Sequence, residues 1–228
     1  FYAAQKLGAI TVSINAIFRS AEVEYLLNDS GAKAVFTVGE LAQFVPRERC
    51  PALAHVVICE GEAPAGTASL ADWCDGRDAR FELADCAADA PASLLYSSGT
   101  TGFPKGVTLT QSNIATNSAT AAKCSGYRPD DRLAAFLPLF HVYGQNYIMN
   151  AAVLAGATLA LFRRFVPDQV LEAIGRERIT MFFGVPTIFI ALLSADLTPY
   201  DLSSIRYEMS AAATMPEEIS RRWTERFG

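Results

Sequence analysis

Apolar residues recur along the first part of the chain with two different spacings. In Ser20–Gly31 they lie three and four residues apart, which predicts a helix that its first residue can cap and its last can end. Short runs rich in β-branched residues at Lys33–Val38 and His55–Cys59 instead predict strands. The stretch Glu60–Ala90 is rich in alanine, glycine and aspartate and has little periodicity. We therefore expect a surface loop there, with one helical turn around Trp73.

From residue 93 onward, strand-like and helical segments alternate. The predicted strands are short apolar runs: Leu94–Tyr96, Val107–Thr110, Arg132–Leu137, Thr158–Phe162, Ile179–Phe183 and Ile205–Ser210. The predicted helices, several of which open on a capping residue or a proline, are Ser112–Cys124, Tyr143–Ala155, Pro167–Arg178, a helix from Pro186, and Pro216–Phe227. Because apolar strands alternate with helices, the sequence predicts an α/β fold with mainly parallel sheets covered by helices on both faces.

The composition narrows the class of protein. Of the 228 residues, 51% are hydrophobic and 19% are charged, which is typical of a globular protein with a substantial core. The net charge of −5 offers no basic surface for a nucleic acid, and the most apolar stretch, Asn150–Phe162, is too short for a membrane span. The five cysteines form no C-x-x-C pair, so we expect free thiols in a reducing cytoplasm rather than disulfides or zinc ligands.

The strongest chemical signal is the segment Tyr96–Gly106, with the sequence YSSGTTGFPKG. Its glycines let backbone N–H groups approach an anion closely. Four hydroxyl side chains add short donors, and Lys105 adds a mobile positive charge. A polyphosphate needs these groups, although a flexible hairpin tip with a solvated lysine would use the same residue types. A P-loop is excluded, because Lys105 follows a proline and a strand rather than a helix comes next.

This segment resembles the phosphate-binding signature of the adenylate-forming superfamily, which includes acyl-CoA synthetases, firefly luciferase and the adenylation domains of peptide synthetases. Further parts of the chain resemble segments of the same family in the same order: LGAI at residues 7–10 with Asn15, YLLNDS at 25–30, LPLFHVYG at 137–144, GVPT at 184–187 and MSAAA at 209–213. The resemblance covers nearly the whole chain. It implies that residues 1–228 are part of the large N-terminal AMP-binding domain, in which residues 1–92 form a first sub-region with a variable loop at 60–90 and residues 93–228 carry the phosphate loop and the acyl pocket.

The resemblance also implies a role for each matched residue. His141 and Lys105 would be catalytic. The phosphates of ATP and the departing pyrophosphate would be held by Ser97, Ser98, Gly99, Thr100, Thr101, Gly102 and Lys105. The substrate pocket would be lined by His141, Tyr143, Gly144, Gly184 and Val185, and adenine would lie against the backbone of Ser210, Ala211, Ala212 and Ala213. Mg²⁺, with Thr100 as a ligand, would neutralise charge as the carboxylate attacks the α-phosphorus.

Some of these residues also have ordinary structural explanations. A lone histidine in an apolar run is often a packed core residue, but a strand ending near Pro138 would place His141 at the carboxyl edge of the sheet, where α/β proteins bind ligands. Tyr143 could equally pack in the core. The small residues Ser210–Ala213 could serve only the close packing of a strand.

The chain departs from the family pattern in places. Gln111 stands where many members carry histidine, and Ala211 replaces a common glycine. Family segments expected after residue 228 include a Gly-Tyr-Gly-x-Thr-Glu motif, a ribose-binding aspartate, a hinge and the small mobile C-terminal domain with its catalytic lysine. Because Phe1–Leu7 reads like the end of a helix, we expect the chain to be a piece of a longer protein. We expect it to be inactive alone and to carry an exposed sheet edge that favours a dimer.

The function expected of the longer protein is the ATP-dependent activation of a carboxylic acid as its acyl-AMP, with transfer to the thiol of coenzyme A. The residues after His141 resemble the fatty-acyl branch of the family, so a medium- or long-chain fatty acid is expected, with an aryl acid as the alternative. An acyl carrier protein with its phosphopantetheine thiol is an alternative acceptor. An alternative of another class is a non-catalytic nucleotide-binding or interaction domain, which the intact phosphate segment argues against.

Overall fold

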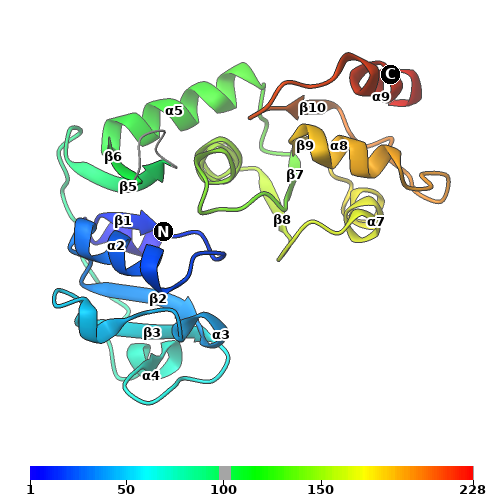
Figure 1. Ribbon diagram of the computed structural model, residues 1–228. Coiled ribbons are helices and arrows are strands. Elements are labelled where there is room, and N and C mark those ends of the chain that lie inside the picture. The colour runs from blue at the N-terminus through cyan, green and yellow to red at the C-terminus, as the bar shows by residue number, and fades with distance from the viewer. Residues whose placement is uncertain (98–103, 228) are drawn as a thin grey trace. The chain divides into compact units, whose positions relative to one another are not determined.

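The computed structural model describes residues 1–97 and 104–227 (Figure 1). The chain divides into two compact units, an N-terminal unit of residues 1–113 and a C-terminal unit of residues 114–228. The first contains the segment that resembles a phosphate-binding signature, and the second contains the other predicted site residues. Within the described ranges, no helix combines the length and the apolar character that crossing a membrane requires.

The N-terminal unit is built from short elements. In chain order they are α1 (Tyr2–Lys6), β1 (Thr11–Ser13), α2 (Ser20–Ser30), β2 (Ala34–Val38), α3 (Gly39–Ala42), the 3-10 turn η1 (Arg47–Arg49), β3 (His55–Glu60), β4 (Ala68–Ser69), α4 (Leu70–Cys74), β5 (Pro91–Ser97) and β6 (Lys105–Thr110). Helix α2 buries Val23, Leu26 and Leu27, which lie on one face because they are three and four positions apart. Gly31 ends this helix in the left-handed conformation, at φ 63°, which a residue without a Cβ adopts at little cost.

Two three-stranded sheets lie in this unit. Strands β2, β3 and β4 are parallel and follow the spatial order β2-β3-β4. The second sheet has the order β1-β5-β6, in which β5 pairs parallel with β1 and antiparallel with β6. The β5–β6 pair is therefore a hairpin, and Ser97 stands opposite Lys105 where the chain passes from one strand to the other.

Helix α5 (Gln111–Cys124) leads into the C-terminal unit, whose strands all run in the same direction. The elements are β7 (Arg132–Ala135), the π-helix η2 (Tyr143–Asn150), α6 (Ala151–Ala155), β8 (Thr158–Leu161), α7 (Pro167–Glu177), β9 (Met181–Gly184), α8 (Pro186–Leu193), β10 (Tyr207–Ser210) and α9 (Glu217–Phe227). The sheet has the order β10-β9-β7-β8 and is parallel throughout. Strand β9 is buried along its whole length, in agreement with its continuous apolar sequence.

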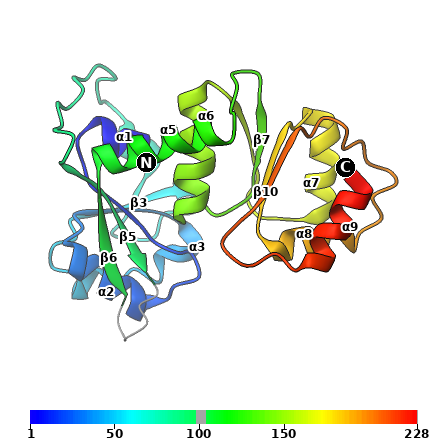
Figure 2. The same cartoon turned by 90° about the horizontal axis from the view of Figure 1, so that it is seen from above.

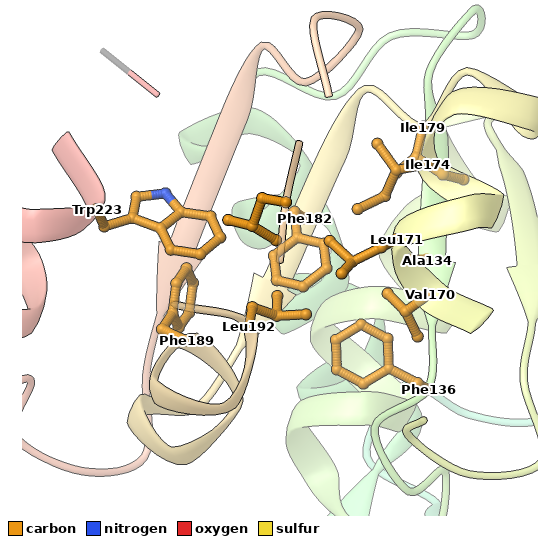
Figure 3. Packing of buried hydrophobic residues seen from close by; sticks show 11 residues of the cluster. Ala134, Phe136, Val170, Leu171, Ile174, Ile179, Phe182, Phe189, Leu192 and Trp223 are labelled. Carbon is orange, nitrogen blue, oxygen red and sulfur yellow. The ribbon is translucent and has the colours of Figure 1, made fainter. Parts of the chain in front are cut away.

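Helices cover both faces of the parallel sheet (Figure 2). On one face, η2 and α6 pack against Leu133 and Phe183. On the other face, Phe189 of α8 meets Trp223 of α9 edge to face, with ring centroids 4.8 Å apart, beside Phe182 of β9 (Figure 3). Phe182 and Phe183 point to opposite faces because side chains alternate along a strand. The C-terminal unit therefore confirms the predicted α/β fold with helices on both faces, whereas the β5–β6 hairpin adds an antiparallel pair.

An ion pair between a buried carboxylate and a partly exposed arginine connects the amino ends of three strands in this sheet. Asp131, Thr180 and Arg206 each stand one residue before β7, β9 and β10 respectively. The side chain of Asp131 is 2% exposed, and its carboxylate accepts hydrogen bonds from Arg206 Nε at 2.8 Å and from Thr180 Oγ1 at 2.7 Å. The backbone N–H of Arg128 donates to the other carboxylate oxygen at 2.7 Å. We call this group the amino-edge cluster.

Most predicted elements are present with boundaries shifted by a few residues, and several details differ. The strands predicted at Leu94–Tyr96 and Val107–Thr110 are too short, because Ser97 belongs to β5 and Lys105 begins β6. Ser20 is not the cap of α2, since the helix includes it and the Arg19 N–H is satisfied by the Glu22 carboxylate at 3.1 Å. The strands β1 and β4 are too short to produce a sequence pattern and were not predicted.

Candidate functional site

Three parallel strands of the C-terminal unit bring the predicted site residues of that unit to one edge of the sheet. β9 ends at Gly184 and β10 ends at Ser210, and these two residues are directly paired in register. The segment that follows β7 contains His141. In a parallel sheet the carboxyl ends of all strands lie at the same edge, which is where open α/β sheets bind ligands.

His141 lies in an exposed loop rather than in the core. Its backbone N–H donates to Pro138 O at 3.1 Å, and its carbonyl accepts from the Gln145 N–H at 2.9 Å. The ring nitrogen Nδ1 accepts a hydrogen bond from the Tyr143 N–H at 3.2 Å. Because Nδ1 is an acceptor, the neutral ring carries its proton on Nε2, which can donate a hydrogen bond to an anion.

Directly after His141 the chain forms a π-helix, η2, instead of the predicted α-helix start. Gly144 is buried in its first turn, and a Cβ at this position would overlap Pro138 O and stand 3.1 Å from Leu137 O. Gly144 therefore lets the first turn of η2 lie against the backbone of the loop that carries His141. π-Helices are rare and occur frequently at functional sites.

Tyr143 occupies an aromatic cluster under η2. Its ring lies 5.7 Å from that of Tyr147, and the same cluster includes Phe183 of β9 with Tyr207 and Met209 of β10. The Tyr143 hydroxyl is buried and forms no hydrogen bond within the described chain. Burial raises the pKa of Tyr143, so the phenol stays protonated and its O–H remains a donor at neutral pH. Tyr143 thus packs in a core, as one of its two interpretations allowed, and also carries a polar atom that a ligand could satisfy.

The two predicted pocket residues after β9 have distinct roles in the local structure. Gly184 is buried, and a Cβ there would stand 2.8 Å from the ring of Phe189 and 3.4 Å from Ile188. Val185 is extended and half-buried, and Pro186 follows it as the first residue of α8. The chain therefore turns from strand to helix over a small residue, which leaves backbone rather than side chain at this edge.

The predicted adenine-binding segment continues from β10. The Ala211 N–H donates to Gly184 O at 3.1 Å, which extends the pairing of β10 with β9 by one bond. The Ser210 Oγ is buried and forms no hydrogen bond within the described chain. Ala212 has φ of 69°, a left-handed conformation that costs a residue with a Cβ on the order of 1–2 kcal/mol, and both Ala212 and Ala213 are exposed. Backbone strain of this kind concentrates at functional sites.

The predicted phosphate-binding residues lie on the β5–β6 hairpin of the other unit. Ser97 and Lys105 are exposed and face each other across the two strands, with Ser97 Oγ 3.5 Å from Lys105 O. The remaining predicted phosphate ligands, Ser98, Gly99, Thr100, Thr101 and Gly102, lie outside the described residues. Gly106 is packed against Tyr96, since a Cβ there would stand 3.2 Å from its ring.

The predicted magnesium ligand, Thr100, also lies outside the described residues. Among the described residues, no three histidine, cysteine, aspartate or glutamate side chains gather in a way that could hold a metal ion. Mg²⁺ therefore stays a proposal that rests on the family resemblance, and no chemical step below depends on it.

Some of the side chains that surround the site were not predicted from the sequence. Tyr147, Tyr207 and Met209 contribute to the cluster around Tyr143. A signal for two of them exists, because Tyr207 and Met209 are two positions apart on a strand and therefore share a face. Tyr147 lies four residues after Tyr143, a spacing that also predicts a shared face in an ordinary helix.

Known proteins resemble this chain in sequence and in fold. The sequence model of a protein family described as "AMP-binding enzyme" matches residues 1–228. Benzoate–CoA ligase of Thauera aromatica is 34% identical over 233 residues, which cover 100% of this chain and 44% of the relative. 4-Coumarate–CoA ligase 2 of Solanum tuberosum is 34% identical over 226 residues, which cover 96% of this chain and 41% of the relative.

The fold also matches solved structures. The anthranilate CoA ligase AuaEII, crystallised in complex with anthranoyl-AMP, superposes with a TM-score of 0.90 at 30% sequence identity. The superposition covers 98% of this chain and 44% of that protein. The chain thus spans less than half the length of these relatives.

Proposed function

Because the chain belongs to the family of AMP-binding enzymes, we propose that the protein containing it activates a carboxylic acid with ATP as the acyl-AMP and then joins the acyl group to coenzyme A. The observation that carries this proposal is the meeting of the carboxyl ends of β7, β9 and β10 at one sheet edge. That edge combines the Nε2–H donor of His141, strand ends built from small residues, and an apolar cluster with a buried hydroxyl.

In the first step, a carboxylate oxygen bonds to the α-phosphorus of ATP, the bond from that phosphorus to the bridging oxygen breaks, and pyrophosphate leaves. We assign His141 to hold the carboxylate through Nε2–H, which orients an anion that would otherwise be repelled by the phosphates. Lys105, at the end of the β5–β6 hairpin, would stabilise the negative charge on the departing pyrophosphate together with the hydroxyls of the segment 98–102.

In the second step, the sulfur of a thiol attacks the acyl carbonyl carbon and AMP leaves. Coenzyme A is the proposed acceptor, because the relatives described above are named CoA ligases. An acyl carrier protein bears the same phosphopantetheine thiol and is the second candidate. The two acceptors are distinguished by which one becomes a thioester in the presence of ATP and the acid.

For the acid, we propose an aromatic carboxylic acid ahead of the fatty acid expected from the sequence. The three relatives are named for benzoate, 4-coumarate and anthranilate. The cluster under η2 is rich in aromatic rings, including Tyr143, Tyr147 and Phe183, which favour stacking or edge contacts with an aryl group. The Tyr143 hydroxyl in that cluster, which has no hydrogen-bond partner among the described residues, favours an acid with a polar ring substituent over an unbranched alkyl chain.

The test is acid-dependent exchange of pyrophosphate into ATP, measured on the full-length protein with a series of aromatic acids and a series of fatty acids. We expect exchange with at least one aromatic acid. The substitution His141→Ala should lower kcat/KM for the acid by about 100-fold, and Lys105→Ala should raise KM for ATP by about tenfold. Val142→Ala removes only an exposed side chain beside His141 and serves as the matched control.

Each outcome of this test has a meaning. Exchange with fatty acids alone would overturn the aromatic substrate and restore the expectation from the sequence. Absence of exchange with every acid, from a folded protein that binds ATP, would contradict the ligase and favour a nucleotide-binding module.

A further inference from the structure

One motif singled out by the sequence has no role in the function proposed above. The stretch 25–30, YLLNDS, lies in helix α2, and it resembles a family segment without suggesting any chemistry. Its two leucines are fully explained, because Leu26 is 0% and Leu27 is 2% exposed in the core of the unit. Asn28 and Ser30 donate to the backbone oxygens of Arg49 and Leu26. Tyr25 and Asp29 lie four positions apart on α2, so both side chains leave the same face of the helix.

Both side chains contact the β5–β6 hairpin, one at each strand. The Tyr25 hydroxyl donates to Pro104 O at 2.9 Å, immediately before β6 begins at Lys105. The Asp29 carboxylate accepts from the Tyr96 hydroxyl at 2.6 Å, immediately before β5 ends at Ser97. The two tyrosine rings also meet edge to face, with centroids 6.4 Å apart. One turn of α2 therefore contacts the hairpin both at Tyr96 and at Pro104.

These contacts are well suited to fix the position of the hairpin relative to helix α2. The two hydrogen bonds join residues 79 and 67 positions apart in the sequence, so neither is a by-product of local chain geometry. The bond to Asp29 is charge-assisted, which makes it shorter and stronger than a neutral one. Burial, and then the hydrogen bond to Asp29, raise the pKa of Tyr96, so its phenol keeps the proton that it donates. The helix itself is anchored by its buried leucines.

We propose that Tyr25, Asp29 and Tyr96 are positioning residues for ATP, which act by holding the hairpin that carries Ser97 and Lys105 in a fixed place on helix α2. The proposal rests on the function proposed above, in which Lys105 and its neighbours hold those phosphates. None of the three residues needs to touch the nucleotide. Preorganisation of this kind improves binding because Ser97 and Lys105 need not be brought into place when the anion arrives.

The proposal predicts that variants of these residues lose affinity only for ligands that carry the β- and γ-phosphates. The substitutions Tyr25→Phe and Tyr96→Phe each remove one hydroxyl and leave the edge-to-face ring contact in place. In the full-length protein, each should weaken binding of α,β-methylene-ATP about fivefold, the size expected for one hydrogen bond. Binding of AMP, which lacks the β- and γ-phosphates, should stay unchanged. Both affinities are measured by isothermal titration calorimetry.

Further variants separate the positioning role from helix stability. Asp29→Asn keeps an oxygen that accepts from Tyr96 and should restore near wild-type affinity, whereas Asp29→Ala should match Tyr96→Phe. Combining Tyr96→Phe with Asp29→Ala should cost no more than either alone, because both remove the same bond. Asn28→Ala is the matched control, since it removes a side-chain bond from the same turn of α2 to Arg49 O instead of to the hairpin.

The outcomes also separate this proposal from the function. Equal weakening of AMP and α,β-methylene-ATP would show a merely structural role and overturn the positioning. Unchanged binding of α,β-methylene-ATP in both tyrosine variants would also overturn the proposal. The same holds if the wild-type protein binds α,β-methylene-ATP no more tightly than AMP. Because these affinities need no turnover, a protein that showed the selective loss but no acid-dependent exchange would retain the positioning role and refute the ligase.

Discussion

At the scale of single residues, the site depends on positions where the side chain is small or polar for a stated physical reason. His141 is held by two backbone hydrogen bonds and by the Tyr143 N–H on Nδ1, so its ring orientation is set by the chain around it. Gly144 lets the first turn of η2 pack against the loop that carries His141. The geometry of the histidine is therefore a property of the whole segment from Pro138 to Gln145.

Gly144→Ala tests this dependence directly. An added Cβ would overlap the backbone oxygen of Pro138, and a backbone atom cannot rotate away as a side chain can. We expect a loss of about 1–3 kcal/mol in the free energy of unfolding, measured by chemical denaturation. We also expect an increased KM for the carboxylic acid, because relief of the overlap displaces the loop with His141.

Gly175→Ala is the matched control for this substitution. Gly175 lies in helix α7, where an added Cβ would stand 3.1 Å from Asp201 O, tight but without the overlap found at Gly144. The gain in helix propensity of about 1 kcal/mol offsets part of that crowding. If Gly144→Ala were as stable as the wild type, the close approach of η2 to the loop would not be a constraint on the site.

At the scale of elements, the sequence predicts well those segments that bury a continuous apolar surface. The strands β7 and β9 were predicted from continuous apolar runs, which are buried. The helices α2 and α7 were predicted because their buried side chains repeat with the period of a helix. The π-helical winding of η2 was not predicted, and neither was the packing of Gly144 against a loop, which is a tertiary contact. The positions of His141, Gly184 and Ser210 at one edge follow from the parallel strand order, which the alternation of strands and helices does predict.

The contacts of α2 with the hairpin could not be predicted from the sequence. Tyr25 and Asp29 form a motif in the sequence, but their partners Pro104 and Tyr96 are 79 and 67 residues away. No local pattern specifies which distant atom a tyrosine hydroxyl will reach. The same limit applies to the amino-edge cluster, whose members come from three separate strand starts.

The amino-edge cluster gives a prediction at the scale of the sheet. Asp131→Asn replaces a buried carboxylate that accepts bonds from Arg206, Thr180 and the Arg128 N–H, so the Arg206 guanidinium loses its charge partner. We expect the free energy of unfolding at pH 7 to fall by about 2–4 kcal/mol, measured by urea denaturation. Asp130→Asn makes the same change of charge at the neighbouring exposed carboxylate and should stay within about 0.5 kcal/mol of the wild type.

The pH dependence of the same pair of proteins follows from the pKa of Asp131. Burial alone would raise this pKa, but the hydrogen bonds from Arg206, Thr180 and the Arg128 N–H outweigh burial and hold it below its usual range. A lowered folded-state pKa stabilises the protein above the unfolded pKa of about 4 and loses that contribution as pH falls through the folded value. The stability difference between wild type and Asp131→Asn should therefore be full near neutrality and shrink below about pH 4. A difference that is constant down to pH 2 would contradict the ion pair as its source.

Another carboxyl group on the sheet, that of Glu208, has a pKa shifted in the opposite direction. Burial raises the pKa of Glu208, although the indole N–H of Trp223 donates to it. A raised carboxyl pKa favours the folded state as pH falls, so Glu208 adds stability in acid. This contribution is common to the wild type and the Asp131→Asn variant, and it cancels in the difference between them.

At the scale of the whole molecule, the 228 residues hold two compact units but less than half the length of the related ligases. Among the described strands, β6 and β8 are two of the six that are paired on one side only. They expose Val107 at 47% and Leu161 at 70%. Unpaired apolar edges of this kind favour pairing with another chain.

The isolated 228-residue chain should therefore fold, associate and show no acid-dependent exchange. We expect light scattering after gel filtration to give a mass above that of one chain. Replacing both Val107 and Leu161 with lysine should shift the mass toward the monomer, because edge lysines oppose strand pairing. Val153→Lys, at a 52% exposed position on α6, is the control that changes charge away from a strand. A monomeric wild-type chain would refute the edge association, and measurable exchange by the chain would refute its inactivity.

The pairing of β1 with β5 has a consequence for how the chain is made. The Ser93 Oγ donates to Thr11 O across a separation of 82 residues, and closing a loop of that length costs about 4 kcal/mol of chain entropy. On the ribosome, β1 and α2 emerge long before β5 exists, whereas the sheet of β2, β3 and β4 draws only on residues 34–69. The nascent chain therefore carries β1 without its partner until translation has passed residue 97. The hairpin assigned to phosphate binding is therefore the last part of the N-terminal unit to be synthesised, and its pairing with β1 completes that unit.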